Sequence, residues 1–200
     1  MRMINVLFLL ACFAAIGSVH GQEVRTKVLP TSAWQVLEDA RGIRVGGPID
    51  ARPSIQVIFD ANCPYCARLH ESLLRDHPEI AVRWVPIAYF RTDSAVLAAA
   101  ILNSPDPQAS LRRNFSEYDY KSHHGGYPVP ERHASVPFGK AQTELEKFWK
   151  TWGGYTPMYI FRDKQGQIRM TGGAAGYIVE QVIKMSAPAT SIRNPTPLHD

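Results

Sequence analysis

The sequence predicts an α/β fold made of a strand–helix–strand unit, a helical insertion and a β-hairpin. Two mostly apolar, β-branched runs at residues 54–59 and 80–90 predict strands that are buried on both faces. Between them, a segment with helical spacing begins at a Cys-X-X-Cys pair, Cys63 and Cys66. Further along, two alternating segments flank a polar turn at residues 162–166, which is the pattern of a hairpin.

The residues before the first strand, 22–53, form a mixed lead-in to this domain. The one regular element predicted in it is a short helix over residues 34–40, which Ser32 can cap. Several glycines and Pro48 follow and end that pattern.

The helix that follows the cysteines is predicted over residues 63–76. Leu69, Leu73 and Leu74 lie on one side of it, and Pro78 stops it because proline cannot continue the helical hydrogen bonding. A helix that joins two neighbouring buried strands implies a right-handed parallel crossover.

Residues 92–153 read as a helical insertion after the second strand. Thr92 and Asp93 can cap its first helix. The predicted segments are, in order, an alanine-rich helix that ends before Pro105, a polar helix at 108–118, a loop rich in Gly, Pro and His at 121–138, and a helix at 141–152.

The hairpin strands PMYIF and QIRMT come next, and Gly172 and Gly173 end the second one. A last helix is predicted over residues 177–185, and the proline-rich residues 186–200 are expected to form a flexible tail. With a Cys-X-X-Cys pair at the start of its first helix, this order of elements is the thioredoxin arrangement. We therefore expect one thioredoxin-like catalytic domain over residues 54–185.

The first 21 residues have the pattern of a secretory signal peptide. Arg2 is the one charged residue, an apolar stretch follows at 6–16, and small residues lead to a cleavage site after Gly21. The apolar stretch is too short to cross a bilayer, which takes about 20 residues. An alternative interpretation makes Cys12 the acylated residue of a lipoprotein, but the apolar run continues beyond it. Secretion by a cleavable signal predicts a periplasmic protein.

Charge and cysteine content exclude several classes of protein. The net charge is +4 and the basic residues are scattered, whereas nucleic-acid-binding proteins concentrate them in patches, so no nucleic-acid partner is expected. The chain has three cysteines, of which Cys12 lies in the signal segment. A secreted domain with only two further cysteines is not a disulfide-stabilised scaffold.

A zinc site and a structural disulfide are the two competing interpretations of Cys63 and Cys66. A structural zinc ion needs four ligands, and no second Cys-X-X-Cys pair is present. His123, His124 and His133 lie far along the chain in a Gly-rich loop and read as solvated polar residues. A disulfide between residues three apart closes a very short loop, where the entropic stabilisation is smallest. No metal site is therefore predicted.

A redox pair explains the placement of the cysteines better. The first cysteine of a pair at a helix start meets unpaired backbone N–H groups and the positive end of the helix dipole, and both favour its thiolate. Thiolate is the attacking species in disulfide exchange, and a second thiol nearby can resolve the mixed disulfide. Cys63 is therefore predicted to attack and Cys66 to resolve. Pro64 suits the first turn, where its missing N–H would be unpaired.

A second motif, Gly-Tyr-Thr-Pro, ends at Pro157 just before the first hairpin strand. A proline at the head of a strand needs no functional explanation. In thioredoxin folds, however, a cis proline at this place packs beside the cysteine pair. We therefore predict that Pro157 is cis.

Taken together, these motifs resemble the DsbC/DsbG family of periplasmic disulfide isomerases and reductases. The similarity lies in F-D-x-x-C-P-Y-C-x-x-L-H-E at residues 59–71 and in Gly-Tyr-Thr-Pro followed by a strand, a D-x-x-G turn and two glycines. The resemblance implies that Cys63 and Cys66 are catalytic. It also implies that Thr156 and Pro157 form a wall of the substrate site, which Pro64 and Tyr65 are expected to border.

The chain also departs from this family. Its members normally begin with a dimerisation domain and a linker helix, whereas only residues 22–53 precede the catalytic domain here. We therefore expect a monomer with weak isomerase activity.

Two functional hypotheses follow from different classes. The first is a thiol–disulfide oxidoreductase without a cofactor that reduces or isomerises disulfides of envelope proteins, with a membrane thiol reductase as its electron donor. The resemblance to DsbG adds the reduction of sulfenic acids, which requires the same thiolate attack. The alternative is an envelope chaperone that binds metal or client proteins through Cys63 and Cys66 without redox turnover.

Five further residues have structural interpretations. Asp60 is expected to end the first strand, and His70 to be a partly exposed helix residue. The tryptophans expected in the core are Trp84, Trp149 and Trp152.

Overall fold

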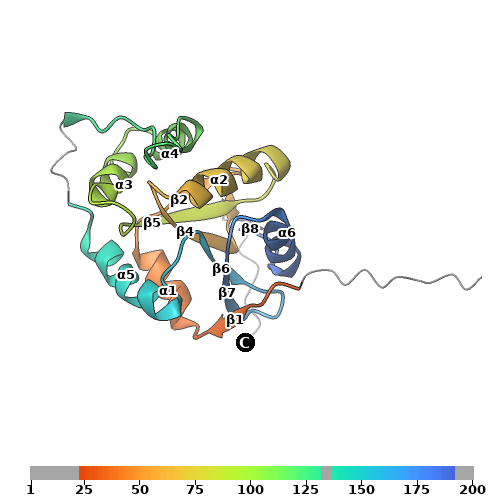
Figure 1. Cartoon of the computed structure of the whole chain (residues 1–200). Coiled ribbons are helices and arrows are strands. Elements are labelled where there is room, and N and C mark those ends of the chain that lie inside the picture. The colour runs from red at the N-terminus through yellow and green to blue at the C-terminus, as the bar shows by residue number, and fades with distance from the viewer. Residues whose placement is uncertain (1–22, 132–136, 192–200) are drawn as a thin grey trace, which may run out of the picture.

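The fold is described by a computed structural model of residues 23–131 and 137–191 (Figure 1). Its centre is a six-stranded sheet in the order β1-β7-β6-β4-β5-β2, and a second sheet pairs β3 with β8. The predicted signal peptide with Cys12, and His133 in the insertion, lie outside the described residues, as does most of the predicted tail. The predicted α/β fold is confirmed.

The strand–helix–strand unit is present as predicted. β4 (Ile55–Asp60) leads into α2 (Pro64–Asp76), and β5 (Val82–Ile87) returns parallel to β4. The second strand is shorter than predicted because the chain leaves the sheet after Ile87, and the N–H groups of Tyr89 and Phe90 donate to the Asp60 carboxylate. Because α2 follows β4 directly, the start of α2 lies at the carboxyl end of this central strand.

The hairpin completes the centre of the sheet. β6 (Met158–Arg162) pairs antiparallel with both β4 and β7 (Ile168–Gly172). A last helix, α6 (Gly176–Met185), follows, close to its predicted bounds. Because β6 lies next to β4, the residues just before β6 lie near the start of α2.

The lead-in contributes more structure than its sequence predicted. β1 (Lys27–Leu29) pairs with β7 at one edge of the sheet, and β2 (Ile43–Val45) pairs with β5 at the other. A two-residue strand, β3 (Ala51–Arg52), pairs with β8 (Thr190–Ser191) near the C-terminus. No strand was predicted in the lead-in, because runs of two or three residues are too short to show a period.

The lead-in helix α1 (Ser32–Asp39) begins earlier than predicted. Ser32 lies in its first turn, and Thr31 holds the cap position without a side-chain hydrogen bond to the helix. The prediction that Ser32 caps the helix is therefore wrong.

The helical insertion divides between the two faces of the sheet. It comprises α3 (Ser94–Leu102), α4 (Pro107–Ser116) and α5 (Lys140–Trp152). Side chains of α3 and α4 join the core that contains α2, α6 and both cysteines, whereas α5 packs with α1 on the opposite face (Figure 1). Trp84 is buried in the first core and Trp149 and Trp152 in the second, as predicted.

Within the described parts of the chain, no helix combines the length and the apolar character needed to cross a membrane.

Candidate active site

Cys63 lies at the junction between β4 and α2. It occupies the N-cap position of α2 in an extended conformation, and Pro64 follows in the first turn. Its carbonyl accepts hydrogen bonds from the N–H groups of Cys66 and Ala67, at 3.1 and 3.2 Å, which begin the helix. The sulfur of Cys63 therefore lies at the end of α2 where backbone N–H groups point outward.

The two thiols have opposed acidities. A hydrogen bond from the Cys66 thiol is the main cause that lowers the pKa of Cys63 to about 7, helped by Thr156 and by the backbone N–H groups of Tyr65 and Cys66, and opposed by burial. Complete burial is the main cause that raises the pKa of Cys66 well above its ordinary value, and the neighbouring Cys63 raises it further. Near neutral pH, a single thiolate on this pair is therefore centred on Cys63.

The motif that ends at Pro157 lies beside the cysteine pair, because β6, which follows it, pairs with β4. The peptide bond between Thr156 and Pro157 is cis, as predicted. The Cys63 sulfur lies 3.6 Å from the carbonyl oxygen of Thr156, and the Thr156 hydroxyl lies 3.0 Å from that of Tyr89. The fold thus brings Thr156 and Pro157 beside Cys63, although more than 90 residues separate them in the sequence.

An open groove of about 550 Å³ borders this site. Its walls come from the start of α2, from the turn before β6 and from the segment between β7 and α6. Its lining includes Tyr65, Arg68, Tyr155, Thr156, Pro157 and Ile178. The Tyr65 side chain is 56% exposed, and the Arg68 guanidinium lies over its ring at 5.6 Å from the centroid. The groove therefore offers aromatic surface and one cation next to Cys63.

One side of this groove depends on a glycine. At Gly172, a Cβ atom would lie 1.9 Å from the ring of Tyr155. Only glycine therefore allows Tyr155 to pack against the end of β7.

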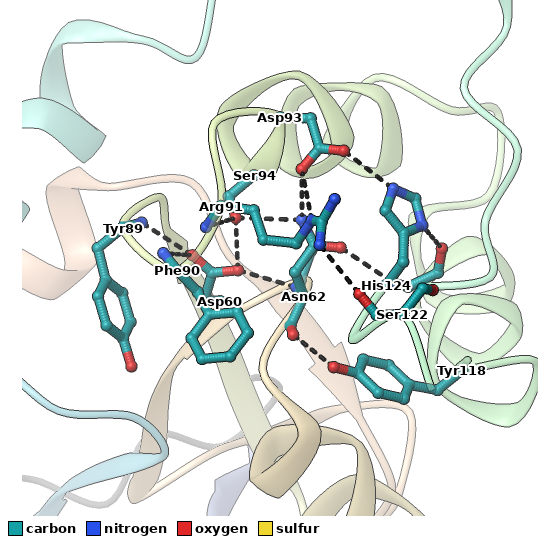
Figure 2. Close-up of polar contacts among 12 residues, drawn as sticks. Asp60, Asn62, Tyr89, Phe90, Arg91, Asp93, Ser94, Tyr118, Ser122 and His124 are labelled. Atoms are coloured by element: carbon teal, nitrogen blue, oxygen red, sulfur yellow. Dashed lines mark hydrogen bonds and ion pairs between the residues drawn. The ribbon is translucent and has the colours of Figure 1, made fainter. Parts of the chain in front are cut away.

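Asp60 does more than end its strand. Its fully buried carboxylate accepts hydrogen bonds from the backbone N–H groups of Asn62, Tyr89 and Phe90 and from the Ser94 hydroxyl, at 2.8–2.9 Å (Figure 2). Asp60 does end β4, as predicted, but the prediction missed these four hydrogen bonds. Asp60 joins the loop before Cys63 to the chain that leaves β5.

His70 does not match its prediction as a partly exposed residue. It is 1% exposed, with its ring against those of Trp84 and Phe115. Burial, together with the positive charge of Arg112, lowers the pKa of His70 to about 4. Among the described residues its Nε2 has no hydrogen-bond partner. His70 lies one turn after Cys66 and one turn before Leu73, on the buried side of α2, so the helical spacing could have placed it in the core.

The histidines of the insertion lie in a different environment. His123 is exposed, and His124 pairs through its Nε2 with the Asp93 carboxylate at 3.0 Å. Over residues 23–131 and 137–191, no group of three or more His, Cys, Asp or Glu side chains could hold a metal ion.

Sequence reasoning missed several residues around the cysteines. The Tyr118 hydroxyl donates to the carbonyl of Asn62 (Figure 2). Tyr89 contacts Thr156 through its hydroxyl, and Arg68 lines the groove. The position of Asn62, directly before Cys63, was the one available signal for this group.

Comparisons with known proteins agree with this geometry. The family model of the thioredoxin-like domain matches residues 49–186. The thiol:disulfide interchange protein DsbG of Pseudomonas aeruginosa is 33% identical over 85 residues, which are 42% of this chain and 33% of the relative. The match thus spans only a third of the length of DsbG. It confirms the resemblance that the sequence motifs indicated.

Two solved structures share the fold. A disulfide interchange protein from Neisseria gonorrhoeae superposes with a TM-score of 0.52 at 17% identity, over 74% of this chain and 96% of that one. The catalytic domain of Proteus mirabilis ScsC superposes with a TM-score of 0.50 at 23% identity, over 76% and 93% of the two chains. With the family match over more than half of its length, the chain belongs to the thioredoxin-like domain family.

Proposed function

We propose that this protein is a periplasmic thiol–disulfide oxidoreductase that acts on disulfides of envelope proteins. The observation that carries the proposal is the contrast between the two thiols. Cys63 has a pKa of about 7 at the start of α2, and the protonated Cys66 lies buried behind it. This is the pairing that an attacking and a resolving cysteine require.

The proposed reaction uses only the two cysteines. The Cys63 thiolate attacks one sulfur of a client disulfide, forms a mixed disulfide and releases the other client sulfur as a thiolate. Cys66 then loses its proton and attacks the Cys63 sulfur, which releases the second client thiolate. The client gains two electrons, and the protein is left with a Cys63–Cys66 disulfide. A membrane thiol reductase is the proposed donor that returns it to the dithiol form.

The groove is the proposed site for the client chain. Thr156 and Pro157 lie beside the attacking sulfur, and Tyr65 lines the groove from α2. Pro64 is not part of the groove lining, but it follows Cys63 directly in the first turn of α2 and is proposed to border the client there. An exposed aromatic side chain gives large contact area at a low cost in conformational entropy. An extended client segment can therefore lie along Thr156 and Pro157 with its disulfide facing Cys63.

Sulfenic acids on single-cysteine proteins are a further proposed substrate. The same Cys63 thiolate would attack the oxidised sulfur and displace hydroxide, and Cys66 would resolve the resulting mixed disulfide. The name of the relative DsbG supports the exchange of thiols and disulfides in general. The alternative function, an envelope chaperone that binds metal or clients, predicts binding without turnover.

Insulin reduction by the purified chain tests the proposal. We expect turnover by the wild type, none by Cys63→Ser, and trapped mixed disulfides with Cys66→Ser, because that variant still attacks but cannot resolve. Iodoacetamide should label Cys63 before Cys66, with a rate that is half-maximal near pH 7. Preferential labelling of Cys66 would overturn the assignment. Tight binding of Zn²⁺ or Cu⁺ by a reduced protein that leaves insulin intact would favour the chaperone instead.

A further inference from the structure

Asn62, the residue directly before Cys63, is held through its backbone. It is fully buried. Its N–H donates to Asp60 Oδ1 at 2.8 Å, and its carbonyl accepts a hydrogen bond from the Tyr118 hydroxyl (Figure 2). Tyr118 follows α4, so one of these two partners comes from the helical insertion.

The side chain of Asn62 is held by the insertion as well. Its Nδ2 donates to Asp93 Oδ1 at 3.0 Å and to the Ser94 hydroxyl at 3.1 Å, at the start of α3. Its Oδ1 accepts a hydrogen bond from the N–H of Gly125 at 2.9 Å. Donors and acceptors of the Asn62 amide are thus paired with two separate segments of the insertion (Figure 2).

The residue before Asn62 is anchored to the same part of the chain. The carbonyl of Ala61 accepts a hydrogen bond from Asn114 Nδ2 at 2.8 Å. Gly125 lies so close that a Cβ atom there would come within 2.7 Å of that carbonyl. The loop that leads to Cys63 therefore packs directly on residues far along the chain.

This arrangement matters because hydrogen bonds to a thiolate are directional. The hydrogen bond from the Cys66 thiol and, to a smaller extent, contacts with Thr156 and with the backbone N–H groups of Cys66 and Tyr65 stabilise the Cys63 thiolate. All of them act only while the sulfur lies over the start of α2. A buried network whose members are all paired is rigid, and a misplacement of about 1 Å at a reacting group can cost about 100-fold in rate.

We propose that Asn62 is a positioning residue through which the helical insertion holds the Cys63 sulfur over the N-terminus of α2 and beside Thr156. The inference rests on the proposed function, in which Cys63 attacks. It assigns the insertion a role in the exchange reaction through contacts to the loop before the nucleophile, without any contact of its own with the client.

The pH dependence of Cys63 alkylation tests the role of Asn62. In the reduced protein with both cysteines, Asn62→Ala should raise the midpoint of the alkylation profile by about one pH unit and lower the rate at pH 7 about fivefold. Tyr118→Phe keeps the packing and removes one hydrogen bond, so it should shift the midpoint in the same direction by less.

Asn103→Ala is the matched control, because Asn103 also makes hydrogen bonds through both its Oδ1 and its Nδ2 but caps the far end of α3. Its alkylation profile should equal that of the wild type.

An unchanged midpoint in Asn62→Ala, or an equal shift in Asn103→Ala, would overturn the proposal. If Asn62→Ala does not fold, Tyr118→Phe decides by the same criterion. The pH dependence of alkylation measures the acidity of the Cys63 thiol, which depends on the position of its sulfur and not on turnover. A wild type that fails to reduce insulin would therefore contradict the proposed function while the comparison of alkylation profiles still decides the role of Asn62.

Discussion

Cys63 and Cys66 lie one helical turn apart, yet their sulfur atoms meet different surroundings. Both cysteines belong to the same buried core, but Cys63 caps the helix, where the Cys66 thiol and backbone N–H groups face its sulfur. Cys66 lies fully buried within the helix. Hydrogen bonds to the charged form lower one pKa, and loss of solvation raises the other. The proposed direction of attack therefore depends on the positions of the two cysteines within a single turn of helix.

His70 leads to a prediction about stability at low pH. Its pKa is about 4 in the folded protein and near 6.5 in an unfolded chain, so only the unfolded state takes up a proton between these values. Folding stability should therefore fall as the pH decreases from 6.5 towards 4. His70→Leu removes this proton uptake and the unpaired Nε2. Its stability relative to the wild type should therefore rise by about 2 kcal/mol from pH 7 to pH 5.

Urea denaturation of both proteins at the two pH values measures this difference. A stability difference between variant and wild type that is the same at pH 7 and pH 5 would show that His70 has the same pKa in the folded and the unfolded state, and would contradict the prediction.

At the level of secondary structure, α1 depends on a side chain from the neighbouring strand. Arg83 of β5 donates to the carbonyl of Leu37 at 2.8 Å and to that of Ala40, which caps α1. It also donates to Gln56 Oε1 at 2.7 Å. The last carbonyls of a helix have no hydrogen-bond partners within it. The Arg83 guanidinium supplies donors to two carbonyls at this end of α1.

Arg83→Met should therefore destabilise the fold by about 1–3 kcal/mol, because it leaves buried carbonyl groups unpaired. Insulin reduction should stay unchanged, since α1 packs on the face of the sheet opposite to Cys63. Urea denaturation and the insulin assay measure the two effects.

The control is Arg75→Met at an exposed arginine that pairs with Asp76. Such a surface pair contributes less than about 1 kcal/mol. If Arg75→Met and Arg83→Met cost the same, the contacts of Arg83 with α1 do not stabilise the helix end.

At the scale of the whole molecule, the lead-in is part of the central sheet. β1 and β2 occupy its two edges, and α1 buries Ala33 and Leu37 against the core around α5. Trp34 packs on the same core. Among residues 23–53, the exposed large apolar side chains are Val28 and Ile49, whereas an obligate interface usually buries about 2,000 Å² or more.

We therefore expect the protein to be a monomer that reduces disulfides but rearranges wrong ones slowly. Isomerisation requires a misfolded client to be held while one disulfide opens and another forms, and a single groove beside Cys63 holds only a short segment. Light scattering gives the oligomeric state, and a scrambled-ribonuclease assay gives the isomerase activity. A tight dimer with strong isomerase activity would refute this expectation.

The elements that the sequence alone predicted are those with a local pattern. The β-branched runs that became β4 and β5, the apolar spacing of α2 and the turn between β6 and β7 are each visible within a window of about ten residues. The predicted roles of Cys63 and Cys66 came from the same kind of local signal, whereas the cis Pro157 was predicted from its place in the thioredoxin arrangement.

Only the tertiary structure decided the contacts between distant segments. The edge strands β1 and β2 are too short to show a period, and their partners in the sheet define them. His70 became a core residue because Trp84 and Phe115 cover it. Asn62 is held by side chains and backbone that lie more than 30 residues away. Such contacts form only when the chain folds back on itself, so no stretch of sequence around Asn62 encodes them.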